Sequence, residues 1–125
     1  MAKILIVDDS EQMAHLLGEI VSLFGHEATV AHSGERGLEL ARSLKPDLIL
    51  LDIMMPHMDG WEFLKRYRQA SSSPSTVPVL MISADESIAT RKKAAKHKVP
   101  LLPKAIEPLL LKDKIESALS ESIKA

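Results

Sequence analysis

The sequence contains no cysteine, and this absence excludes several kinds of chemistry at once. Disulfide bonds, thiol nucleophiles and cysteine-ligated zinc sites are all ruled out. A cysteine-free composition also suits a reducing compartment, so we expect a cytoplasmic protein. Aromatic residues make up only 3% of the 125 residues, so the core must consist mainly of aliphatic side chains and methionine.

Long apolar runs and an excess of one charge are also absent. The formal net charge is −1, so no global field steers the protein toward nucleic acid or an acidic membrane, and we expect neither as a direct partner. No apolar run approaches the length of about 20 residues that a membrane helix needs. The first ten residues, MAKILIVDDS, are typical of neither a signal peptide nor a membrane span.

What the sequence does contain is a series of short apolar runs at fairly even spacing. The chain is long enough for one ordinary core, and we expect a single domain covering residues 1–125. The runs predict five strands, at residues 3–7, 27–31, 47–51, 77–82 and 99–102. The first, third and fourth of these runs are continuously apolar, which is typical of strands covered on both faces of a sheet.

Helical patterns fill the intervals between these runs. Apolar residues from Met13 to Phe24 recur at helical spacing, with Ser10 placed as an N-cap and Gly25 just past the end. The serine-rich segment 69–76 predicts a loop. Further helices are predicted at 34–44 after Ser33, around 63–67, at 88–97, and from Pro108 through 119.

The alternation of five strands with five helices predicts an α/β fold. Short βαβ units imply parallel strands with right-handed crossovers and helices on both faces of the sheet. For five strands the common solution is the flavodoxin-like, doubly wound (βα)5 sandwich with strand order 2-1-3-4-5. The fifth strand, within VPLLP, carries two prolines, which fits the edge position that this order gives it.

Polar residues follow these strands at their carboxyl ends. They are Asp8 and Asp9 after the first strand, Asp52 after the third, Ser83-Ala84 after the fourth and Lys104 after the fifth. Ligand sites in open α/β sheets form beyond the carboxyl ends of the strands, where the strand order reverses. Each residue alone could be a helix cap, a turn residue or a solvated side chain. Their coincidence at one edge of the sheet favours a functional site.

A cluster of three carboxylates is unfavourable by itself, because like charges repel and raise at least one pKa. A hard divalent cation would relieve this repulsion, and carboxylate, carbonyl and water ligands suit Mg²⁺, Mn²⁺ or Ca²⁺. So few protein ligands favour Mg²⁺, which keeps several waters, with Mn²⁺ as the alternative. Lys104 can balance the charge without a metal, or bind an anion beside it.

Four parts of the sequence carry a resemblance to a known family: ILIVDDS (4–10), PDLILLDIMMPHMDG (46–60), VPVLMISA (77–84) and Lys104. In these motifs the chain closely resembles the receiver domains of two-component response regulators, over essentially its whole length. The resemblance implies a signalling phosphoacceptor rather than an enzyme. Its only expected reactions are its own phosphorylation and dephosphorylation, because an acyl phosphate is labile.

The resemblance also implies a role for each acidic residue. Asp52 would be the phosphoacceptor, which attacks the phosphorus of a phosphohistidine on a histidine kinase or phosphotransfer domain. Asp9 would bind Mg²⁺ directly and Asp8 through a water molecule. Asp52 itself and the backbone carbonyl of Met54 would complete the protein ligands.

The phosphoryl group would meet three further residues that match the family. The hydroxyl of Ser83, the backbone amide of Ala84 and the ammonium of Lys104 would contact its oxygens. Phosphoryl transfer depends mainly on positioning and charge neutralisation, which Mg²⁺ and Lys104 would both supply.

Two features depart from the family pattern. The family usually has Lys-Pro after the fifth strand, whereas this chain has Lys104-Ala105. A cis bond before Ala105 would cost about 3–4 kcal/mol, so we expect either a trans bond with a shifted loop or a strained cis bond. Leu101 stands where the family often has tyrosine or phenylalanine. In the family that aromatic ring swings inward when the serine or threonine hydroxyl moves toward the phosphoryl group. Leucine has no such ring, so this usual switch is in question here.

The segment RKKAAKHK at 91–98 carries five lysines and arginines. It is either a solvated helix face or an output surface for an acidic partner. In the family, the face formed by the fourth helix, fifth strand and fifth helix commonly contacts the downstream protein or domain. The resemblance also admits a phosphorylation-dependent dimer.

Two other functions stay open from the sequence. A pseudo-receiver would use the same fold as a binding scaffold without phosphate. An aspartate-nucleophile phosphatase would normally carry a second acid two residues after the nucleophile, where this chain has Met54, whose thioether cannot donate a proton. Whether the receiver stands alone or belongs to a longer regulator also stays open.

Overall fold

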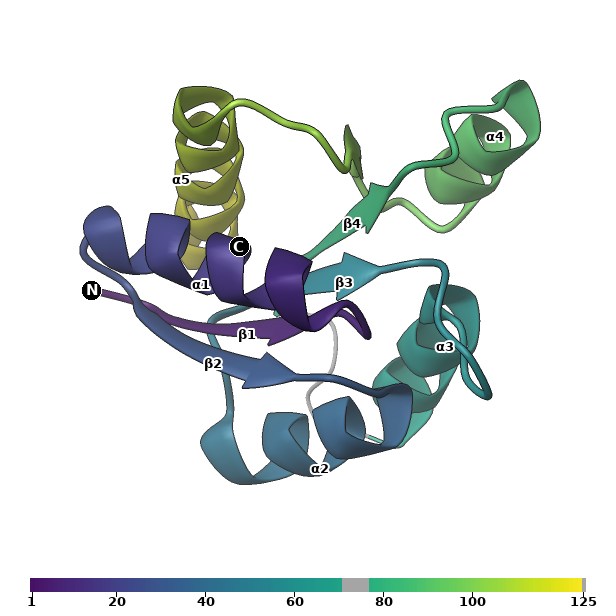
Figure 1. Cartoon of the computed structure of the whole chain (residues 1–125), viewed down its shortest axis with the longest axis horizontal. Coiled ribbons are helices and arrows are strands. Elements are labelled where there is room, and N and C mark those ends of the chain that lie inside the picture. Colours follow the sequence, from purple (N-terminus) through teal and green to yellow (C-terminus); the bar gives the residue numbers. More distant parts are fainter. Residues whose placement is uncertain (71–76, 125) are drawn as a thin grey trace.

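The computed structural model describes residues 1–70 and 77–124, in which strands and helices alternate along the chain. Figure 1 shows one twisted sheet with helices on both of its faces. The elements are β1 (Lys3–Val7), α1 (Glu11–Leu23), β2 (Glu27–Ala31), α2 (Gly34–Leu44), β3 (Leu48–Asp52), α3 (Gly60–Ala70), β4 (Val79–Ser83), α4 (Ile88–Lys96), β5 (Leu101–Pro103) and α5 (Pro108–Lys124).

The sheet has the predicted topology. All strand pairings are parallel and the order is β2-β1-β3-β4-β5, which confirms the flavodoxin-like α/β arrangement. Residues of β3 and β4 are buried throughout, because helices cover both faces of the sheet. The proline-containing β5 is an edge strand, as predicted. The strand order reverses between β1 and β3, so a ligand site is expected at their carboxyl ends.

Alternate residues of each strand serve opposite faces of the sheet. In β1, Ile4 and Ile6 belong to the core under α1 and α5. Leu5 and Val7 belong to the opposite core, which α2 and α3 cover. Figure 1 shows these two helix layers on either side of the strands.

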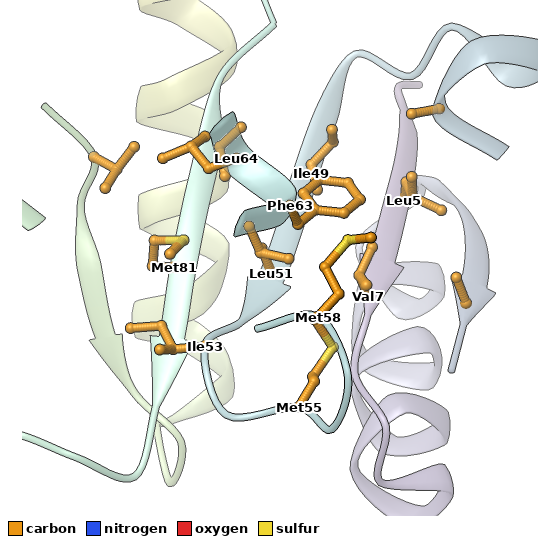
Figure 2. Packing of buried hydrophobic residues seen from close by; sticks show 14 of the residues in the cluster. Leu5, Val7, Ile49, Leu51, Ile53, Met55, Met58, Phe63, Leu64 and Met81 are labelled. Carbon is orange, nitrogen blue, oxygen red and sulfur yellow. The ribbon is translucent and has the colours of Figure 1, made fainter. Parts of the chain in front are cut away.

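Three methionines and one phenylalanine pack among aliphatic side chains in the core beneath α2 and α3 (Figure 2). Phe63 of α3 is fully buried, and Met55 and Met58 pack into the same cluster from the loop before that helix. A β-carbon at Gly37 of α2 would lie only 2.9 Å from side-chain carbons of Phe63 and Val7. The absence of a side chain at Gly37 therefore lets α2 approach the sheet closely, which brings its layer against the end of β1.

The predicted helix ends are confirmed where polar caps specified them. Ser10 and Ser33 accept hydrogen bonds from the first turns of α1 and α2. Gly25 follows α1 with φ +86°, a conformation that glycine adopts without strain. Pro108 begins α5, as expected for a residue without an amide donor.

Several predicted boundaries were wrong by one or two residues. The strands predicted at 47–51, 77–82 and 99–102 occupy Leu48–Asp52, Val79–Ser83 and Leu101–Pro103. Apolarity marks side-chain burial, whereas the hydrogen-bonded ladder continues through polar end residues such as Asp52, which pairs with Ile82. Of the predicted loop at 69–76, Gln69 and Ala70 belong to α3, and residues 71–76 lie outside the described ranges.

The bond between Lys104 and Ala105 is trans, which decides between the two expected conformations. Within the described residues, no helix is both long enough and apolar enough to span a bilayer.

Candidate functional site

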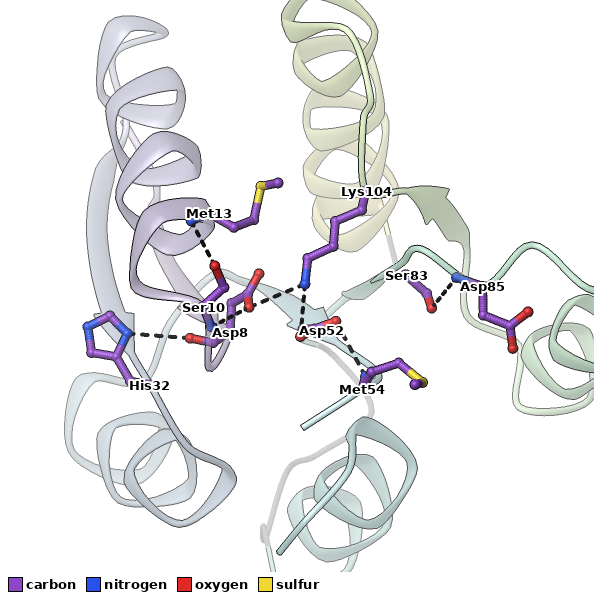
Figure 3. Close-up of polar contacts among 9 residues, drawn as sticks. All are labelled: Asp8, Ser10, Met13, His32, Asp52, Met54, Ser83, Asp85 and Lys104. Atoms are coloured by element: carbon purple, nitrogen blue, oxygen red, sulfur yellow. Dashed lines mark hydrogen bonds and ion pairs between the residues drawn. The ribbon is translucent and has the colours of Figure 1, made fainter. Parts of the chain in front are cut away.

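Four strands bring charged or polar side chains to one edge of the sheet, as the sequence predicted (Figure 3). Asp8 and Asp9 follow β1, and Asp52 is the last residue of β3. Lys104 follows β5. One carboxylate oxygen from each of the three aspartates lies within 4.8 Å of the other two. The three carboxylates that the sequence predicted to converge therefore do lie together in the structure.

The ammonium of Lys104 lies between two buried carboxylates. Its Nζ is 3.2 Å from Oδ2 of Asp52 and 3.5 Å from Oδ1 of Asp8. Asp52 and Asp8 are 2% and 1% exposed, so both ion pairs form largely out of water. The backbone amide of Lys104 donates to the carbonyl of Ser83 at 3.1 Å, which ties this side chain to the end of β4.

The chain after β3 folds back tightly against Asp52. The amide of Gly60 donates to the carbonyl of Ile53 at 2.8 Å, which closes the loop between β3 and α3. A β-carbon at Gly60 would lie 2.7 Å from the carbonyl oxygen of Asp52 and 2.8 Å from Cα of Ile53. Only glycine fits this approach, so the D-G pair in the sequence fixes the backbone that carries Asp52. The amide of Met54 also donates to Oδ1 of Asp52, at 3.4 Å.

Asp8 has one carboxylate oxygen with protein partners and one without. Oδ1 accepts the amide of Ser10 at 2.9 Å and contacts Lys104. Oδ2 is buried and has no hydrogen-bond partner within residues 1–70 and 77–124. A buried carboxylate oxygen is costly unless it is paired or coordinates a metal. This buried oxygen of Asp8 is therefore chemically suited to be a metal ligand.

The pKa values of the site follow from this crowding. Burial, and then the charge of Asp8, raise the pKa of Asp52 from 3.8 to about 7 against the lowering effect of Lys104. Burial opposes protonation of Lys104, but the charges of Asp52 and Asp8 outweigh it and raise the pKa of its ammonium. The lysine therefore stays charged at neutral pH, while Asp52 is held close to its titration point.

The donor set fits a hard divalent cation. Three carboxylates offer oxygen ligands, one of their buried oxygens lacks a partner, and their mutual repulsion is only partly relieved by one lysine. Oxygen ligands of this kind suit Mg²⁺ or Mn²⁺. The side chain of Met54 is exposed, and the metal-binding role of its carbonyl stays a prediction.

Ser83 and Ala84 occupy the end of β4 beside this cluster. Ser83 is 1% exposed, and its Oγ accepts a hydrogen bond from the amide of Asp85 at 3.0 Å. Ala84 is exposed. The alternative interpretation of Ser83 as the cap of the fourth helix was wrong, because Ser87 caps α4. Similarly, Ser10 caps α1, so capping does not account for Asp9.

Asp85 is a residue that the sequence analysis missed. Its carboxylate accepts hydrogen bonds from the amide of Ser87 at 2.9 Å and from the hydroxyl of Thr90 at 2.6 Å. The spacing of Ser87 and Thr90 resembles a capping box, with a hydroxyl at the third helical position, and could have pointed to this network.

A family model describing the response regulator receiver domain matches residues 4–116. The chain belongs to this family. The match covers β1 from its second residue, the other four strands in full, and all the residues of the acidic cluster.

Individual relatives agree with this assignment. The receiver domain is 42% identical over 84 residues to the transcriptional regulatory protein CpxR of Escherichia coli K12, covering 67% of this chain and 34% of CpxR. It is 40% identical to the alkaline phosphatase synthesis transcriptional regulatory protein PhoP of Bacillus subtilis, with the same coverage. The chain thus spans about a third of the length of these curated relatives.

A solved structure of similar size is the chemotaxis protein CheY4 of Vibrio cholerae. It is 28% identical, has a TM-score of 0.87, and the superposition covers 94% of this chain and 98% of CheY4. The receiver domain therefore resembles nearly all of the solved CheY4 chain as well as about a third of the longer regulators.

Proposed function

We propose that this receiver domain accepts a phosphoryl group on Asp52 from a phosphohistidine, in a reaction that depends on Mg²⁺. The observation that carries the proposal is the ion pair between the buried Asp52 and the partly exposed Lys104, 3.2 Å apart, beside a cluster of three carboxylates. A nucleophile, a fixed cation and ligands for a second cation are the parts that phosphoryl transfer requires.

In the proposed step, an ionised oxygen of Asp52 attacks the phosphorus. A phosphorus–oxygen bond forms as the phosphorus–nitrogen bond breaks, and the electron pair of that bond returns to the imidazole ring. Lys104, which already contacts Oδ2 of Asp52, would neutralise charge on the phosphoryl oxygens. The hydroxyl of Ser83 and the amide of Ala84 would donate hydrogen bonds to the same oxygens.

Asp8, Asp9, Asp52 and the carbonyl of Met54 would hold the metal ion, Mg²⁺ or alternatively Mn²⁺. When bound, the ion would neutralise charge on the transferred group. A pKa near 7 leaves much of Asp52 protonated at neutral pH, so a cation beside it would also favour the ionised, nucleophilic form.

The partners follow from the same proposal. A histidine kinase or a phosphotransfer domain would supply the phosphoryl group. The face of α4, β5 and α5 would then contact an output protein or an output domain. CpxR and PhoP are transcriptional regulatory proteins by name, which is consistent with an output that controls transcription.

Phosphorylation with a small acyl phosphate tests the chemistry without a partner. The protein is incubated with acetyl phosphate and Mg²⁺, and intact mass spectrometry measures the fraction that gains a phosphoryl group. We expect wild type and the exposed control Asp113→Asn to gain it, and Asp52→Asn not to gain it. Equal gain in Asp52→Asn, or no gain in any of the proteins, would show that the proposal is wrong.

A further inference from the structure

The sheet has two edge strands, and the sequence protects only one of them against pairing with a further strand. β5 is three residues long and ends at Pro103, which has no amide to offer to an added strand. β2, at the other edge, is five residues long and contains no proline, lysine or arginine. Figure 1 shows it as the outermost strand, with α1 on one face and α2 on the other. An open edge of this kind is a template on which another extended chain can pair.

The backbone of β2 offers specific hydrogen-bonding groups to such a chain. Alternate residues of a strand direct their N–H and C=O groups to opposite sides. The amide of Glu27 donates to the chain just before β1 at 2.8 Å, and the carbonyl of Ala31 accepts from the chain just after it at 3.0 Å. These residues therefore face β1. Ala28 and Val30 lie at the alternate positions, so their N–H and C=O groups point to the outer side of β2, where no strand of residues 1–70 and 77–124 lies.

A groove follows this open edge between β2 and α1. Two hollows of about 540 and 570 Å³ adjoin there, and His15 and Val30 line both of them. Leu23, which is 83% exposed, adds apolar surface at the end of α1. An added strand would therefore find room for its side chains beside the backbone groups with which it pairs. We name this surface the edge groove, and it is formed by Glu11, His15, Glu19, Leu23, Ala28 and Val30.

Carboxylates dominate the charge of the edge groove. Glu11 and Glu19 line it, and among the described residues that line the two hollows there is neither lysine nor arginine. The side chain of Glu19 is 63% exposed and contacts the ring of His15 at 3.0 Å. Glu27, also exposed, begins the strand. A second copy of this chain, paired edge to edge, would double these carboxylates along one seam, and facing like charges are destabilising. A basic partner would instead neutralise them.

We propose that the edge groove binds an extended, basic segment of another protein, which adds a sixth strand to the sheet beside β2. Main-chain hydrogen bonds to Ala28 and Val30 supply the affinity, and basic side chains that face Glu11 and Glu19 supply the selectivity. The binding does not depend on phosphorylation of Asp52. The edge groove also lies at the opposite edge of the sheet from β5, and so apart from the face of α4, β5 and α5.

An NMR titration of the isotope-labelled protein with the peptide acetyl-Lys-Val-Lys-Val-Lys-amide tests this binding. A version of the peptide with its central amides methylated keeps the charge but loses the donors, and a version with glutamate in place of lysine reverses the charge. Ala28→Pro removes an outward amide, which an edge strand tolerates, and Ala28→Ser is its matched control because it keeps the amide. Glu19→Gln removes a charge from the edge groove. Its control is Glu39→Gln on α2, where the side chain is similarly exposed, at 64%.

We expect the lysine peptide to shift the amide signals of Ala28 and Val30 and to slow their hydrogen exchange. Loss of one hydrogen bond should weaken binding to Ala28→Pro by about three- to tenfold, whereas Ala28→Ser should bind as wild type does. Glu19→Gln should bind about two- to fivefold more weakly at low salt, because one exposed ion pair is lost. About 0.5 M salt should remove that difference. Glu39→Gln should bind as wild type does.

Four results would overturn the proposal. One is the absence of saturable shifts at Ala28 and Val30 with up to about 5 mM lysine peptide. Equal binding of the methylated peptide would exclude strand pairing, and this comparison needs no variant, so it stands even if Ala28→Pro does not fold. Equal binding of the glutamate peptide would exclude a basic partner. Dimers in sedimentation, with both amides protected before any peptide is added, would make a second copy the occupant.

Discussion

Replacement of Asp52 by asparagine should stabilise the metal-free protein at pH 8. Because the folded state raises the pKa of this carboxyl from 3.8 to about 7, the folded protein binds its proton more tightly than the unfolded chain does. The contribution of this carboxyl to the free energy of unfolding is therefore fully present below pH 3.8 and is lost as the pH rises to about 7. Asparagine carries no charge, so the variant does not lose this contribution at high pH.

The size of the effect follows from the raised pKa. A rise from 3.8 to about 7 corresponds to an upper limit of about 4 kcal/mol at pH 8. Relaxation around the charge reduces this cost, so we expect a gain of about 2–4 kcal/mol in the free energy of unfolding at pH 8. At pH 4 the expected gain is below about 1 kcal/mol, because the unfolded carboxyl is then only partly ionised.

The assay is urea unfolding in EDTA at the two pH values, followed by the fluorescence of the single tryptophan, Trp61. Asp113→Asn, at an exposed position of α5, removes a charge without burial and should change stability by less than about 0.5 kcal/mol. A destabilised Asp52→Asn at pH 8, or an equal gain at both pH values, would refute the reasoning. Added Mg²⁺ should stabilise wild type and so reduce the difference in the free energy of unfolding between wild type and Asp52→Asn.

Three other substitutions or titrations test the site. Gly60→Ala should destabilise by more than about 2 kcal/mol in urea unfolding, because its β-carbon would meet the backbone of Asp52 at 2.7 Å; Gly18→Ala, whose β-carbon would lie 3.7 Å from its nearest neighbour, should be neutral or stabilising. Lys104→Met should destabilise by about 2–3 kcal/mol at pH 8 and less at pH 4, because it leaves buried carboxylates unpaired. The affinity for Mg²⁺, measured by calorimetry, should fall as the pH drops through about 7, since protons compete for Asp52.

Each of these predictions has a clear contrary result. Equal stability of the two glycine variants would mean that the loop after β3 adapts easily. A Lys104→Met protein as stable as wild type at pH 8 would mean that the ion pairs contribute little. An affinity for Mg²⁺ that does not change with pH would mean that the metal ion does not bind the carboxylate of Asp52.

The sequence was informative about the site because parallel strands end at a common edge. Once the runs were assigned to strands, Asp8, Asp52, Ser83 and Lys104 had to lie near one another. Periodicity could not predict that Lys104 would reach two carboxylates at once, since that depends on its rotamer and on the hydrogen bond from its amide to β4. It also left the Lys104–Ala105 bond open, which the structure has as trans.

Helix α4 shows where sequence reasoning reached its limit. Its segment has a weak apolar pattern, and the lysines and arginines drew attention to its outer surface. The contacts that hold it come from Asp85, which precedes the helix, and from Trp61 and Arg68 on α3. Such contacts join residues without a shared period, so only the assembled fold reveals them.

The pairing of Asp52 with Lys104 links assembly of the site to folding of the whole sheet. The two residues are separated by 52 positions in the chain, and the contact between them forms only after β5 has joined the sheet. A complete chain that is partly unfolded contains all of these side chains but cannot bring them together. Under the proposed function, efficient phosphorylation of Asp52 would therefore require a completely folded sheet. Chains that are truncated before Lys104 would lack its cation and would not be phosphorylated efficiently.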